Sequence, residues 1–273
     1  MITPNNWVDI MKIDEIQVPA PGSQLQVEDP TQVLALIDRH CAKYIIEVQR
    51  AQKWLYRGLR NADYPAFVGN SMQDRKPKDS DPYYSQQFDY MLSLLGIQAQ
   101  RHNSIFTTSR SQMTKFFGQT YVIFPIDGAH VFSYTSEPDI VLDSREALRW
   151  ANLHKIDEFK DVLRDLEQSH PDDAVRLAAE MVLNTSDERV FRTLSNLSHS
   201  MLKGHVPEKF WDWKTYLDLD KFVENYKPTD RNLHVALTKT YEVLIHGGYV
   251  ALKLSVYEPM IGMRWGVPVR VPI

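Results

Sequence analysis

An arginine inside a short apolar run is the feature that most limits how this chain can fold. Residues 53–59 read Lys-Trp-Leu-Tyr-Arg-Gly-Leu, so Arg57 stands among β-favouring residues and is followed at once by Gly58. Desolvating a guanidinium is costly unless an anion or a hydrogen-bond partner meets it. Arg57 is therefore expected to point into a ligand-binding cleft, and Gly58 to let the ligand approach the backbone closely.

Two later stretches are expected to accompany this strand. Residues 104–109 form an apolar strand pattern that ends in three consecutive hydroxyls, Thr107, Thr108 and Ser109. In residues 241–245, Glu242 opens a β-branched run, and Gly247-Gly248 follows as a predicted turn.

An arginine strand, a hydroxyl strand and a glutamate strand, in that order, resemble the ADP-ribosyltransferase superfamily with its Arg-Ser-Glu pattern. The resemblance covers roughly residues 30–140 and 232–256. It implies an α+β fold with a split, strongly twisted β core, NAD as substrate, no metal, and a protein or nucleic-acid acceptor. The stretch Arg75-Lys76-Pro77-Lys78-Asp79 looks like those of phage-encoded members.

The resemblance also implies a role for each matched residue. Glu242 would stabilise the positive charge that develops on the ribose when nicotinamide leaves. Arg57 would bind the NAD phosphates through charge-assisted hydrogen bonds. Gly58 would present backbone amides to the nicotinamide carboxamide. Thr107 takes the place of the first serine of the pattern and would orient Glu242.

Four further residues complete the predicted NAD-binding set. Thr108 and Ser109 finish the hydroxyl triplet, Phe117 would stack on the nicotinamide ring, and Arg75 would meet a phosphate from a loop that closes over the ligand. Thr240 departs from the pattern, because arginine-modifying relatives carry a second Glu at this position. The absence of this second Glu argues against arginine as the acceptor.

Each of these residues also has a purely structural interpretation. Glu242 would then be a surface-facing strand residue, Arg57 one half of a structural ion pair, Phe117 a core residue, and Arg75 part of a solvated loop.

Composition limits the class of protein. The chain has 273 residues, 43% of them apolar and 24% charged, with a formal net charge of −4, so a dedicated nucleic-acid binder is not indicated. A single cysteine excludes a disulfide framework and a cysteine-based metal site. Neither a signal peptide nor an apolar membrane span is apparent, and we expect a cytosolic protein.

The chain is expected to divide into four segments. Residues 1–29 form an irregular arm, 30–143 and 232–273 form the catalytic core, and 144–231 form a helical insertion. Helices are predicted to start at Asp29-Pro30 and at Asp81-Pro82, and another at the capping box of residues 185–188. Residues 121–125 and 130–134 flank Asp127-Gly128, which predicts a hairpin, whereas residues 61–82 and the proline-containing tail are expected to be irregular.

The resemblance thus implies a mono-ADP-ribosyltransferase. Two alternatives stay open. One is a related module that has lost turnover and serves in binding or as a virion structural part. The other is an NAD glycohydrolase that passes the ribose to water.

Overall fold

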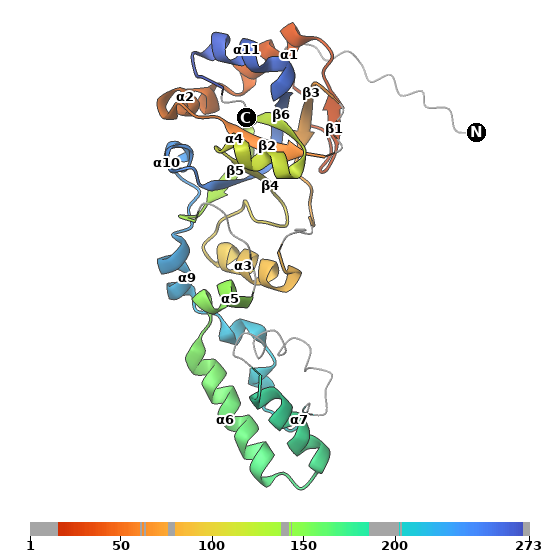
Figure 1. Ribbon diagram of the computed structural model, residues 1–273, viewed down its shortest axis with the longest axis vertical. Coiled ribbons are helices and arrows are strands. Elements are labelled where there is room, and N and C mark those ends of the chain that lie inside the picture. The colour runs from red at the N-terminus through yellow and green to blue at the C-terminus, as the bar shows by residue number, and fades with distance from the viewer. Residues whose placement is uncertain are drawn as a thin grey trace, which may run out of the picture. The chain divides into compact units, whose positions relative to one another are not determined.

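The computed structural model describes residues 16–60, 62, 64–75, 80–137, 142, 144–185, 202 and 204–269, and they form two compact units (Figure 1). Unit 1 holds an antiparallel sheet with its helices and comprises residues 1–75, 97–138 and 229–273. Unit 2 is helical and comprises residues 76–96 and 139–228. The predicted α+β class is confirmed.

A six-stranded antiparallel sheet organises unit 1, in the order β1-β3-β6-β4-β2-β5, and β5 pairs with β6 as well. The strands are β1 (Gln24–Gln26), β2 (Leu55–Leu59), β3 (Ala66–Asn70), β4 (Ile105–Thr108), β5 (Gln119–Tyr134) and β6 (Glu242–Lys253). The additional pairing closes β6, β4, β2 and β5 into a ring of strands.

Strand β6 pairs with a different strand along each half of one edge. Its residues 242–245 pair with β4, and its residues 248–252 pair with β3. Strand β5 runs along the opposite edge of β6 over both halves. The sheet therefore divides near Gly247, the position between the two ladders.

Two helix starts follow the predicted cap chemistry. Asp29 accepts a hydrogen bond from the backbone of Thr31 at the start of α1 (Pro30–His40), and Asp81 accepts one from Tyr83 at the start of α3 (Pro82–Leu94). A proline occupies the first turn of each helix, where its missing N–H costs nothing. The predicted helix from 185 lies almost wholly outside the described residues.

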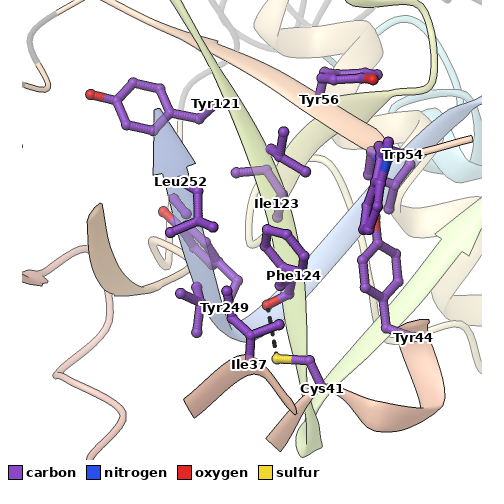
Figure 2. Close-up of a cluster of buried hydrophobic side chains, with 14 of the residues drawn as sticks. Ile37, Cys41, Tyr44, Trp54, Tyr56, Tyr121, Ile123, Phe124, Tyr249 and Leu252 are labelled. Atoms are coloured by element: carbon purple, nitrogen blue, oxygen red, sulfur yellow. Dashed lines mark hydrogen bonds between the residues drawn. The ribbon is translucent and has the colours of Figure 1, made fainter. Parts of the chain in front are cut away.

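The core of unit 1 lies between the sheet and the helices α1, α2 (Ala42–Ala51) and α11 (Leu254–Trp265). Its centre is a group of aromatic rings, in which Trp54 lies 5.5 Å from Phe124 and 5.7 Å from Trp265, measured between ring centroids. Tyr44 meets Phe124 edge-on (Figure 2). The Cys41 thiol is fully buried beside them and donates to the Phe124 carbonyl, and burial raises its pKa.

Unit 2 contains α3, α5 (Ser144–Ala147), α6 (Leu153–Ser169), α7 (Asp173–Leu183) and α9 (Leu219–Tyr226). The described residues of unit 2 also include the short 3-10 turns η2 (Leu148–Trp150), η4 (Glu208–Phe210) and η5 (Trp213–Tyr216). Phe88 of α3 packs against the rings of Trp150, Phe222 and Tyr226, which explains why α3 belongs to this unit. Residues 76–96 thus lie outside the sheet-bearing unit, in contrast to the predicted core of 30–143.

The predicted hairpin at Asp127-Gly128 is wrong, and so is the predicted turn at Gly247-Gly248. Strands β5 and β6 each run through these positions, and the register between them shifts between Pro125 and His130. Four residues of β5 form an irregularity there, and Gly128 and Gly247 both take positive φ. Glycine at a bulge resembles glycine at a hairpin turn in sequence.

Three segments expected to be irregular each contain a regular element. Strand β3 lies in the stretch 61–82, β1 lies in the arm, and α11 begins the tail and contains Pro259. Strand β3 was missed because its five residues stand between Pro65 and polar sequence.

Gly247 provides a test of the bulge. A Cβ on Gly247 would lie 2.2 Å from the Ala129 carbonyl oxygen, whereas one on Gly128 would have nothing within 4 Å. Gly128→Ala is expected to lower the free energy of unfolding by about 1–2 kcal/mol, the cost of positive φ, and Gly247→Ala by clearly more. Urea denaturation of both variants measures this, and equal losses would contradict the predicted clash.

Candidate functional site

The three predicted motif strands are neighbours in the sheet. Thr108 of β4 pairs in register with Glu242 of β6 on one side and with Tyr56 of β2 on the other. Neighbouring strands lie about 4.8 Å apart, so the strands that carry Arg57 and Glu242 are roughly 10 Å apart. Segments separated by more than 180 positions in the sequence thus meet within one patch of the sheet.

Two of the three guanidinium nitrogens of Arg57 lack a hydrogen-bond partner among the described residues. Its Nε and Nη1 atoms are buried and have no hydrogen-bond acceptor in the part of the chain that the structure describes. Burial lowers the pKa of Arg57, and the nearby Tyr249 opposes that shift. A desolvated guanidinium with unused donors is the arrangement that an incoming anion would stabilise.

The register puts Arg57 and Glu242 on different faces of the sheet. Side chains of paired residues point to the same side, and successive residues alternate. Tyr56, Thr108 and Glu242 therefore share one face, while Arg57 points to the other. However, β2 and β4 share the single pair Tyr56–Thr108, so the two strands part immediately beside Arg57.

Glu242 is held by an arginine that the sequence analysis did not single out. Arg101 Nη1 lies 3.3 Å from Glu242 Oε1, and their side chains are 5% and 18% exposed. The Arg101 guanidinium also lies over the Phe106 ring, 4.6 Å from its centroid. Arg101 precedes β4 in a non-periodic connection, so no pattern in the sequence marks it.

Arg75 also lies beside Phe106. Its guanidinium lies 4.1 Å from the centroid of the Phe106 ring, and its Nη1 donates to the Ser104 carbonyl. Phe106 pairs with Leu244 in the ladder that also pairs Thr108 with Glu242. The adjoining residues 76–79 lie outside the described chain.

The three hydroxyls of the β4 motif have backbone partners. Thr107 is buried and donates to the Val243 carbonyl, and Ser109 donates to the Leu237 carbonyl. Thr108 accepts a hydrogen bond from the Arg110 backbone, which leaves its own proton to donate. The predicted bond from Thr107 to Glu242 is thus replaced by a bond to the backbone, and Thr108 is the hydroxyl residue opposite Glu242.

Gly58 and Phe117 lie together, but the space beside Gly58 is filled by protein. A Cβ on Gly58 would lie 2.3 Å from the Thr114 carbonyl oxygen and 2.7 Å from Phe117 Cβ. Gly58 therefore allows α4 (Ser111–Thr114) and η1 (Lys115–Phe117) to pack on β2, a role other than the predicted approach of a ligand. The Phe117 side chain remains 46% exposed.

Thr240 ends α10 (Leu233–Lys239) in the left-handed region, with φ 63°, just before β6. Its hydroxyl accepts a hydrogen bond from Arg110 Nε. Thr240, two residues before Glu242 in the chain, is therefore hydrogen-bonded to a cationic side chain.

Neither a metal centre nor a membrane span is found among the described residues. No group of three or more His, Cys, Asp or Glu side chains could hold a metal ion there, and no helix there combines the length and apolarity that crossing a bilayer requires. Comparison with protein-family models, curated proteins and solved structures found no match.

The unpaired state of Arg57 can be tested through stability. Arg57→Met keeps most of the apolar stem and removes the desolvated charge, so the free energy of unfolding should rise by roughly 1 kcal/mol or more. Arg50→Met at an exposed position should change it by less than about 0.5 kcal/mol. Urea denaturation checks both, and a loss of stability in Arg57→Met would show that the protein itself compensates the cation.

Proposed function

We propose that this chain is a mono-ADP-ribosyltransferase, with a β core of the ADP-ribosyltransferase type in unit 1 and a helical insertion in unit 2. It would cleave the nicotinamide–ribose bond of NAD and transfer ADP-ribose to a macromolecular acceptor. The observation that carries this proposal is the adjacency of β2, β4 and β6, because it brings an arginine, a hydroxyl and a glutamate strand together in one sheet.

The chemistry assigns a role to each group. Departure of nicotinamide leaves an oxocarbenium-like ribose, and the Glu242 carboxylate would stabilise that charge. Thr108, opposite Glu242 in register, would supply the neighbouring hydroxyl. Arg57 would bind a phosphate of NAD, and its unused Nε and Nη1 donors support this role.

The position of Arg57 limits how NAD could bind. Because Arg57 and Glu242 point to different faces, a phosphate would reach the guanidinium where β2 and β4 part, beyond their single pair. Arg75, stacked on Phe106, would be the phosphate-binding group on the face of Glu242.

Nicotinamide release tests the proposal directly. The wild-type protein should release nicotinamide from NAD, and Glu242→Gln should slow release by about 10²–10³-fold, as expected when a group that stabilises transition-state charge is neutralised. Glu28→Gln, at an exposed position, is the matched control and should keep the wild-type rate. Chromatography of the reaction mixture measures both.

The fate of the ribose separates transfer from hydrolysis. Labelled ADP-ribose attached to protein or nucleic acid in a lysate supports transfer, whereas free ADP-ribose without a labelled acceptor would identify an NAD glycohydrolase.

A second candidate is a binding or virion structural protein without turnover. The opposite orientation of Arg57 and Glu242, and the bonds of Thr107 and Ser109 to the backbone, favour it. Absence of nicotinamide release with every lysate added would select this candidate.

A further inference from the structure

We infer that Arg101 is a positioning residue that fixes the Glu242 carboxylate beside β4. This inference rests on the proposed function for its catalytic consequence, although the ion pair itself is a property of the fold. Arg101 lies 141 positions before Glu242 in the chain, and its Nη1 reaches Glu242 Oε1 at 3.3 Å.

Burial makes this pair different from the surface ion pairs of the molecule. The Arg101 side chain is 5% exposed and that of Glu242 is 18% exposed, whereas the Arg264–Asp38 pair on α11 and α1 is 42% exposed on both sides. Water therefore screens the Arg264–Asp38 pair strongly and the Arg101–Glu242 pair much less. Removing one partner of a largely desolvated pair leaves the other charge uncompensated.

The Phe106 ring restricts the orientation in which the Arg101 guanidinium reaches Glu242. The guanidinium rests 4.6 Å from the Phe106 ring centroid, and Phe106 is held in the β4–β6 ladder two residues from Thr108, the partner of Glu242. A planar guanidinium in contact with an aromatic ring has few orientations available. Arg101, Phe106 and Glu242 thus form a support whose position follows the register of β4 on β6.

The consequence for catalysis is geometric and electrostatic. A carboxylate that stabilises a sugar cation must be ionised and aimed at the ribose before the bond breaks. Arg101 holds one oxygen of the Glu242 carboxylate. Holding one oxygen of the carboxylate also fixes the direction in which the other oxygen points. Arg101 itself does not contact the substrate in this role.

Steady-state kinetics of nicotinamide release test the catalytic consequence. Arg101→Ala should lower kcat roughly 10- to 100-fold, the loss typical when a group that orients a reactive residue is removed, with little change in KM for NAD. Arg101→Lys should keep part of the activity, and millimolar guanidinium should restore part of the activity of Arg101→Ala. Arg264→Ala, which loses an exposed ion pair of the same unit, should retain the wild-type kcat.

A double-mutant cycle tests the ion pair independently of activity. The urea midpoints of wild type, Arg101→Ala, Glu242→Gln and the double variant should be non-additive, with the double variant more stable than the sum of the single losses predicts.

Additive losses would overturn the inference whether or not the protein turns over NAD. Non-additive losses in a wild-type protein that releases no nicotinamide would refute the proposed function and retain the ion pair. An active protein whose kcat is unchanged in Arg101→Ala would refute the positioning role alone.

Discussion

The pairing of β6 along both of its edges is the constraint on which the rest of unit 1 depends. Strand β5 occupies one edge throughout, and β4 and β3 divide the other. A strand paired in this way satisfies its backbone donors and acceptors within the sheet, so its register is strongly specified. That register decides which hydroxyl faces Glu242, which face Arg57 takes, and where Phe106 stands.

Arg57 of β2 and Arg101, in the connection before β4, illustrate two solutions to the cost of desolvating a charge. Arg101 has Glu242 and the Phe106 ring beside it, whereas the Nε and Nη1 atoms of Arg57 have no acceptor in the described chain. A desolvated charge that is paired within the protein is stabilised by the fold itself. A desolvated charge without such a partner can be stabilised by a bound ligand. The difference between them lies in the tertiary contacts that each guanidinium makes.

The sequence predicted the features that depend on neighbouring residues. Asp29-Pro30 and Asp81-Pro82 cap helices as expected, because an aspartate before a proline satisfies the first amide donors locally. The existence of the arginine, hydroxyl and glutamate strands was also predictable from their apolar runs. The glycines of β5 and β6 predicted turns that the structure does not have, because a bulge in a long strand and a hairpin turn can both need positive φ.

Other features depend on contacts between distant segments and leave no local pattern. The faces taken by Arg57 and Glu242 follow from a register that no single strand encodes. The bond between Arg101 and Glu242 joins residues far apart in the chain, and Arg101 stands in a connection without periodicity. The packing of α4 and η1 against Gly58 is of the same kind, since it replaces an expected ligand by the protein's own backbone.

The single cysteine gives the sheet-bearing unit an internal reporter. The Cys41 sulfur is completely enclosed, it donates to Phe124 in β5, and its raised pKa keeps it a thiol. Alkylating reagents attack thiolates, so they can reach this sulfur only when the packing of α1 against β5 opens. The rate of labelling therefore reports the opening of this core in an otherwise thiol-free chain, and any cysteine placed on the surface would be labelled selectively.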